Sequence, residues 1–134
     1  MTKLKNDILF ISTPQSFEGG EEEYDIAVGG RNRPNLLKCG QGAFRLASHS
    51  AKRPIKRLAE IGAGGGTCSL GIIAAAKDAE ILLTDTSPAF LRMIQRKLAA
   101  TDLDHLNVKY ATLAGEDLLK LGTSSYDAIV IASA

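Results

Sequence analysis

The chain has 134 residues and a net charge of +1 at pH 7, with 45% hydrophobic and 23% charged residues. This length suits one globular domain, and the balanced charge does not by itself select a nucleic-acid or membrane partner. Since apolar runs fall well short of the ~18 residues that cross a bilayer, we expect no membrane association. Cys39 and Cys68 lack metal or redox spacing, so we expect no metal site and a reducing, cytoplasmic location.

The N-terminal part contains two short apolar runs, residues 6–12 and 24–28, with strand character. A glycine pair and three consecutive glutamates separate them. The two runs favour either a hairpin with a long loop or an extended arm. Residues 36–48 are predicted to form a helix.

The charge then changes sign, because the sequence from Ile26 to Ala59 contains no Asp or Glu. This pattern favours a phosphate or nucleic-acid patch, a solvated face, or a partner for the acidic run Glu21–Glu23. We divide the chain into an N-terminal arm or extension, residues 1–52, and a second domain, residues 53–134. The first part holds the two apolar runs, as a hairpin or an extended arm, and a basic helix or linker. The basic residues of the stretch are Arg31, Arg33, Lys38, Arg45, Lys52, Arg53, Lys56 and Arg57.

From Arg57 onward, predicted strands alternate with predicted helices. Such alternation indicates an α/β domain with right-handed crossovers and a parallel sheet. The unbroken apolar runs also agree with strands that are buried on both faces. The predicted elements are a strand at 57–61, a helix at 67–76, a strand at 79–84, a helix from Ser87–Pro88 to about Ala100, a strand at 108–111, a turn at 115–121 and a strand at 126–131.

Three chemically distinctive features follow the first three of these strands. Glu60 precedes the glycine-dense turn at residues 62–66, Asp85 ends the second strand, and an acidic turn begins at Gly115 after the third. The carboxyl ends of parallel strands meet at one edge of a sheet, where open α/β sheets bind ligands. Bare glycine backbone admits a ligand closely, and a carboxylate such as Asp85 can accept two ribose hydroxyl groups.

Two common nucleotide motifs do not fit this turn. The dinucleotide fingerprint has a third glycine five residues after its first, but Thr67 stands at that place after Gly62. A P-loop needs a lysine and then Ser or Thr after its last glycine, whereas Gly66 is followed by Thr67 and Cys68.

Residues 58–134 resemble the first half of a class I, Rossmann-like methyltransferase that uses S-adenosyl-L-methionine. The segments LAEIGAGGGT, LLTDTSPAFL, NVKYATLAGEDL and YDAIVIASA are similar to the first four motifs of that family. The resemblance implies a three-layer sandwich with a mostly parallel sheet. It also implies that the fold is incomplete relative to the family's seven strands, since the chain stops after the fourth.

The resemblance implies a role for each matched residue. Glu60 would lie near the amino group of the ligand, and the glycines would pass under its methionine and ribose portions. Asp85 would hold the two ribose hydroxyl groups, and Thr86 would flank the adenine. No catalytic residue is named. The full set of expected cofactor-binding residues is Glu60, Gly62, Ala63, Gly64, Gly66, Asp85, Thr86, Gly115 and Glu116.

Two departures from the family pattern matter. Ala114 stands where many members carry an aspartate that binds the adenine amino group, so Glu116 or backbone amides would serve instead. The strand at 126–131 would have one free edge, which invites pairing. Residues 6–28 would cover it, or another chain would do so, as in a homo-oligomer, or the sequence is a fragment of something longer.

Methyl transfer to an unidentified small-molecule or nucleic-acid acceptor is the leading hypothesis. One alternative is a half-domain that binds the cofactor without turnover, or an interaction module that needs a partner chain. Another is a different adenosyl-dependent reaction, such as aminopropyl transfer.

Overall fold

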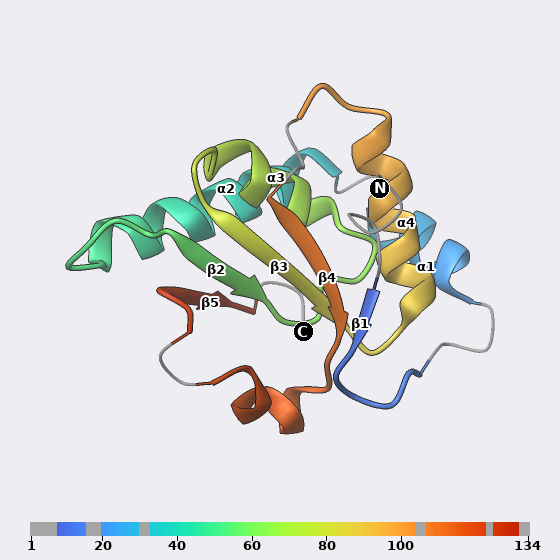
Figure 1. The fold of residues 1–134 in the computed structure, drawn as a ribbon. Coiled ribbons are helices and arrows are strands. Elements are labelled where there is room, and N and C mark those ends of the chain that lie inside the picture. The colour runs from blue at the N-terminus through green and yellow to red at the C-terminus, as the bar shows by residue number, and fades with distance from the viewer. Residues whose placement is uncertain (1–7, 16–19, 30–32, 104–106, 123–124, 132–134) are drawn as a thin grey trace.

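The computed structural model describes residues 8–15, 20–29, 33–103, 107–122 and 125–131, and its elements form a layered α/β structure (Figure 1). The helices and strands lie close to the predicted ones from residue 57 onward. In chain order they are β1 (Ile8–Phe10), α1 (Glu21–Gly29), α2 (Arg33–Ser50), β2 (Arg57–Glu60), α3 (Thr67–Ala75), β3 (Glu80–Asp85), α4 (Pro88–Ala99), β4 (Val108–Thr112), the 3-10 helix η2 (Gly115–Leu121) and β5 (Ala128–Val130).

The five strands form one sheet in the order β1-β4-β3-β2-β5, and all four pairings are parallel. The predicted parallel α/β, Rossmann-like class is therefore confirmed, with fewer strands than the seven of the complete fold. Since every strand runs the same way, the ends of β2, β3 and β4 meet at a single edge of the sheet. This edge carries all the predicted site motifs.

Alternate residues of each strand face two different layers. Leu58, Leu83 and Tyr110 belong to the large core on the side of α3 and α4. Ala59, Leu82 and Ala111 point to the opposite face, where Leu121 at the end of η2 packs against them. The second face therefore has a short 3-10 helix, whereas α2, α3 and α4 all contribute side chains to the core on the first face.

Helices α2 and α3 pack at very close range because each has a glycine at the contact. A Cβ atom on Gly40 would lie 3.1 Å from the backbone nitrogen of Ile72, and one on Gly71 would lie 3.1 Å from that of Gln41. These neighbours are backbone atoms that cannot rotate away. The two glycines thus fix α2 against the first helix of the ligand edge.

The structure contradicts the expected N-terminal hairpin. Residues 8–10 form β1, but β1 pairs in parallel with β4, and residues 24–28 lie within helix α1. Helix α1 begins with three glutamates, Glu21–Glu23, which are favourable at the positive N-terminal end of a helix dipole.

The expectation that residues 6–28 cover the edge of the last strand is also wrong. Strand β1 lies at the opposite edge of the sheet from β5. Since β1 joins the main sheet and α2 packs on α3, the N-terminal part contributes to the same layers. The division at residue 52 stays a prediction.

Charged residues of the N-terminal half pair with several elements. Glu22 in the acidic run forms an ion pair of 3.5 Å with Arg96 of α4. From the basic stretch, Arg53 pairs with Asp127 at 2.7 Å and Arg57 with Glu80 at 3.3 Å. None of the helices that the structure describes is both long enough and apolar enough to span a bilayer.

Candidate functional site

The glycine turn between β2 and α3 combines left-handed backbone with open space. Gly62, Gly64 and Gly66 have φ values of 70°, 56° and 87°, which residues with a Cβ atom rarely adopt. A Cβ atom on Gly62 or Gly64 would meet no atom within 4 Å. On Gly66 it would overlap Ile94 of α4. Gly62 and Gly64 therefore border open space, whereas Gly66 lets α4 approach the turn.

Asp85 at the end of β3 points toward this turn. Its Oδ2 accepts a hydrogen bond of 2.9 Å from the Gly64 amide, and its Oδ1 accepts one of 3.0 Å from the Ser87 amide. Ser87 is the N-cap of α4, so a single carboxylate links the glycine turn to the start of that helix. An ionised carboxylate has about four acceptor positions, and these two bonds leave about two unused.

Glu60, the last residue of β2, is completely buried beneath the turn. Its Oε1 accepts a hydrogen bond from Ser69 of α3, while its Oε2 is buried without a hydrogen-bond partner. Burial raises the pKa of Glu60 from 4.5 to about 7, the Ser69 hydrogen bond opposes that rise, and the negative charge of Asp85 adds to it. A buried acceptor without a donor is costly, so this oxygen marks a place suited to a cationic or hydrogen-bonding group.

The chain after β1 crosses the same edge. Ser12 is buried, and its hydroxyl donates to Oδ2 of Asp117 at 2.6 Å and accepts from the Ala114 amide at 2.9 Å. The Gln15 amide donates to the Thr86 carbonyl at 2.6 Å. Residues 12–15 therefore border the motifs that follow β3 and β4.

The other predicted residues differ in accessibility. Ala63 is buried, and its amide donates to the Thr84 carbonyl at 2.8 Å, so it connects β2 to β3. Thr86 is half-buried, while Gly115 and Glu116 at the start of η2 are exposed. The structure brings Glu60, the glycine turn and Asp85 together. Glu116 lies one strand further along the sheet, after β4.

Two polar residues of this edge, Ser12 and Ser69, were missed in the sequence. Ser69 is one of two hydroxyl residues, with Thr67, in the first turn of the mainly apolar helix TCSLGIIAA, and that contrast was a usable signal. Ser12 gave no local signal, because its partners are more than 100 residues away.

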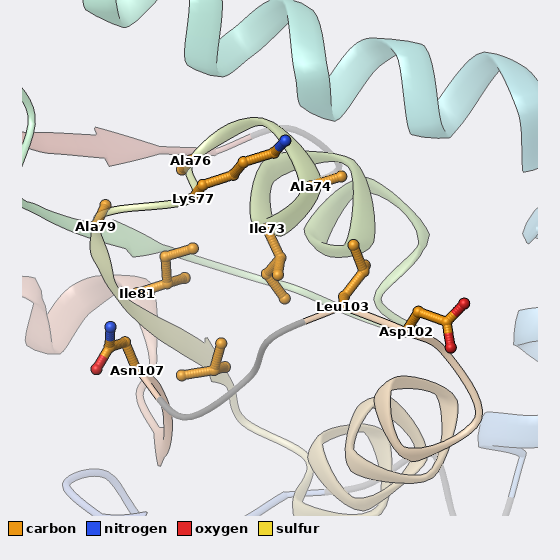
Figure 2. A pocket seen from close by; sticks show the side chains of 10 residues that line it. Ile73, Ala74, Ala76, Lys77, Ala79, Ile81, Asp102, Leu103 and Asn107 are labelled. Carbon is orange, nitrogen blue, oxygen red and sulfur yellow. The ribbon is translucent and has the colours of Figure 1, made fainter.

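A cavity of about 420 Å³ lies at the opposite end of the sheet, where β3 and β4 begin. Figure 2 shows Ile73, Ile81 and Leu103 around it, with Lys77 and Asp102 at its border. It contains none of the predicted site residues. We therefore place the candidate ligand site at the carboxyl edge alone.

A comparison with known protein families shows the family to which the chain belongs. The sequence model of a family described as "Methyltransferase domain" matches residues 59–134, which is more than half of the protein. The chain belongs to the methyltransferase-domain family. The matched region of this family member contains Glu60, the glycine turn and Asp85. A comparison with curated protein sequences found no match.

Solved methyltransferase structures share the fold of this family member. The O-methyltransferase TomG from Streptomyces achromogenes, solved with SAM, has a TM-score of 0.55 at 18% identity over 83% of this chain and 60% of its own. The plantazolicin methyltransferase BpumL, solved with SAH, has a TM-score of 0.50 at 17% identity over 82% of this chain and 38% of its own. At such identities the likeness shows the fold alone. This chain spans less than two thirds of either protein.

Proposed function

We propose that this chain binds S-adenosyl-L-methionine at the carboxyl edge of the sheet and takes part in methyl transfer from it. The observation that carries the proposal is the placement of Asp85 against the turn containing Gly62 and Gly64, with the partnerless oxygen of Glu60 beneath. Membership of the methyltransferase-domain family supports the same conclusion. The cofactor supplies a sulfonium methyl group that is already activated for transfer.

The free acceptor positions of Asp85 suit the ribose portion of the cofactor. Both carboxylate oxygens are held by backbone amides, at 2.9 and 3.0 Å, so the group is oriented before any ligand arrives. Two vicinal hydroxyl groups are donors that match the two unused acceptor positions. We therefore assign Asp85 to the ribose, with Gly62 and Gly64 providing the open backbone beside it.

Glu60 suits the amino group of the methionine portion. A ligand ammonium group, directly or through a water molecule, would supply the donor and the positive charge that its buried Oε2 lacks. Ser69 would then keep the carboxylate oriented through Oε1. In this way a buried acid that destabilises the free protein becomes a contact for the ligand.

The adenine end is less completely built. The side chain of Ala114 has no acceptor for the adenine amino group, and the backbone carbonyl of this residue already accepts a hydrogen bond from the Asp117 amide at 2.9 Å. Its backbone amide donates to the Ser12 hydroxyl. We assign adenine contacts to Thr86, Gly115 and Glu116, of which the last two are exposed. Transfer itself requires alignment of an acceptor with the methyl group, which is catalysis by proximity.

The acceptor and the cellular setting are proposed only in outline. We propose a small-molecule or nucleic-acid acceptor and a cytoplasmic location. Lys38 and Arg45 are exposed on α2 and give the nucleic-acid alternative its support, while Arg53 and Arg57 are engaged in ion pairs. Homo-oligomerisation through the β5 edge is a further proposal, supported by the exposed side chain of Ile129.

The decisive experiment is calorimetric titration of the wild type with S-adenosylhomocysteine, repeated with Asp85→Ala. We expect micromolar binding that the substitution weakens at least about tenfold, which corresponds to about 1.4 kcal/mol. Asp78→Ala is the matched control, because Asp78 is an exposed aspartate at the opposite end of β3. Absence of binding by the wild type would remove the basis of the proposal.

Binding without turnover is the second candidate function. Ala114 in place of an acid favours it, because no carboxylate stands there to bind the adenine amino group. Incubation with labelled S-adenosylmethionine and pools of small molecules or nucleic acid separates the two functions. Label in any acceptor supports transfer, whereas binding with no labelled product in either pool supports a half-domain that needs a partner.

A further inference from the structure

A second polar contact holds the glycine turn from its outer side, which is the side that faces α1 and α4. Its two side chains, Lys97 and Asp25, lie outside the four motif segments quoted above. Lys97 of α4 places its Nζ 2.8 Å from both carboxylate oxygens of Asp25 in α1 and 2.7 Å from the carbonyl oxygen of Gly65. A lysine ammonium has three donors, and these three acceptors match them. The Lys97 and Asp25 side chains are only 21% and 14% exposed, so the pair is partly shielded from solvent.

Gly65 is required here for close approach and not for its backbone conformation. It is absent from the glycines with positive φ, but a Cβ atom on it would overlap the Asp25 carboxylate and lie 2.8 Å from its Cγ. Helix α1 therefore contacts the turn directly through Asp25. Figure 1 shows α1 beside α4. The rings of Tyr24 in α1 and Phe90 in α4 are in contact, with their centroids 5.5 Å apart.

The turn is thus held from two sides. On the ligand side, Asp85 accepts the amide of Gly64, and on the outer side, Lys97 donates to the carbonyl of the next residue, Gly65. Fixing one amide and the following carbonyl restrains the orientation of the peptide units that form the turn. A turn with three glycines at positive φ has high conformational freedom when it is not held, and ordering it on binding would reduce the affinity.

We propose that Lys97, held by Asp25, is a positioning residue that keeps the glycine turn in its ligand-binding conformation before the ligand arrives. The identity of that ligand rests on the proposed function, but the effect of Lys97 on the turn does not. Helix α1 would then be a structural support of the site, although it lies outside the region matched by the family.

The same two helices offer a matched control. Arg96 and Glu22 form a second α1–α4 ion pair at 3.5 Å, but their side chains are 62% and 74% exposed. A substitution of Arg96 therefore tests the general docking of α1 on α4. A substitution of Lys97 tests the contact with the turn.

The experiment compares the wild type with Lys97→Met, Lys97→Arg, Asp25→Asn and Arg96→Met in two measurements. Amide hydrogen exchange of residues 62–66 is measured without ligand, and S-adenosylhomocysteine affinity is measured by calorimetry. We expect Lys97→Met to accelerate exchange in the turn and weaken binding, each by about tenfold, or about 1.4 kcal/mol. Lys97→Arg should restore part of the slow exchange and part of the affinity. Asp25→Asn should show faster exchange and weaker binding than the wild type, but smaller changes than Lys97→Met. The exchange rates and affinity of Arg96→Met should stay within about twofold of the wild-type values.

Two results would overturn the proposal. One is a folded Lys97→Met protein whose turn exchanges as slowly as that of the wild type. The other is an equal effect of Arg96→Met, which would reduce Lys97 to a general helix contact. If Lys97→Met does not fold, the same comparison is made with Asp25→Asn, and a turn that exchanges as slowly in that variant as in the wild type overturns the proposal. A wild type that binds no S-adenosylhomocysteine would refute the proposed function, while the exchange measurement would still test Lys97.

Discussion

The Gly64 amide donates a hydrogen bond of 2.9 Å to Oδ2 of Asp85, and this contact joins two segments that are 21 residues apart in the chain. It brings the carboxylate at the end of β3 against the open side of the turn after β2. A ligand placed there would meet the bare backbone and the carboxylate together. The proposed function depends on this pairing more than on any single residue.

The first prediction concerns the stability of the free protein and Glu60. The folded-state pKa of about 7 exceeds the unfolded value of 4.5, so the folded protein binds more protons between these values. The contribution of Glu60 to the free energy of unfolding should therefore be largest below pH 4.5. It should fall by about 3 kcal/mol as the pH rises from 4.5 through 7. Glu60→Gln should remove this fall. Urea unfolding at several pH values measures it.

The control for this prediction is Glu23→Gln, a change of the same kind at an exposed position of α1. It should leave the pH dependence of the wild type intact. A Glu60→Gln protein that loses stability between pH 4.5 and 7 as steeply as the wild type would refute the assignment of the fall to Glu60.

The second prediction concerns proton release on ligand binding, and it rests on the proposed function. A ligand ammonium group near Glu60 favours the ionised carboxylate and lowers its pKa. At pH 6.5, binding of S-adenosylhomocysteine should then release roughly half a proton or more per molecule bound. Calorimetry in buffers of low and high ionisation enthalpy gives this number directly. Proton release should vanish for the wild type at pH 8.5 and for Glu60→Gln at pH 6.5. Release that persists in Glu60→Gln would show that the proton comes from another group.

The third prediction separates two glycines of the turn. Gly64→Ala should cost about 1 kcal/mol of stability, because left-handed backbone is strained for alanine, and should weaken S-adenosylhomocysteine binding. Gly66→Ala carries the same strain and also overlaps Ile94, so its cost should be about 2 kcal/mol greater. Urea unfolding measures both. Equal costs for the two variants would contradict the different surroundings of these glycines.

The fourth prediction uses two glycines of α2. Gly42 has no atom within 4 Å of an added Cβ, so Gly42→Ala should stabilise the protein by about 1 kcal/mol through better helix propensity. Gly40→Ala should instead destabilise it by about 2 kcal/mol, because the added atom meets the backbone of α3. Thermal unfolding of the two variants provides the comparison. A stabilised Gly40→Ala protein would show that α2 and α3 are not held so closely.

The sequence predicted the part of the fold that depends on local signals. The strands and helices after Arg57 are apolar runs of distinct length, separated by glycine, proline and capping residues, and these signals act over a few positions. Glu60 and Asp85 were predicted to share a site because both end parallel strands. The pairing order of the sheet confirms that β2 and β3 are neighbours.

The N-terminal half was predicted poorly because its signals are ambiguous or non-local. The apolar run at residues 24–28 is too short to distinguish a strand from a buried helix face by periodicity. The acidic run Glu21–Glu23 is typical of the first turn of a helix and would have been the better signal. The sequence carries no local signal for the contact of Lys97 with the turn, since its partner Asp25 is 72 residues away.

The pairing of β1 with β4 also governs the order in which the sheet can form. Ile8 is opposite Tyr110, so more than 100 residues of chain separate the two members of this pair. Closing a loop of that length costs conformational entropy before the pairing can stabilise the fold. Strand β1 can therefore join the sheet only after β4 has been translated, whereas β2 and β3 can already have paired by then.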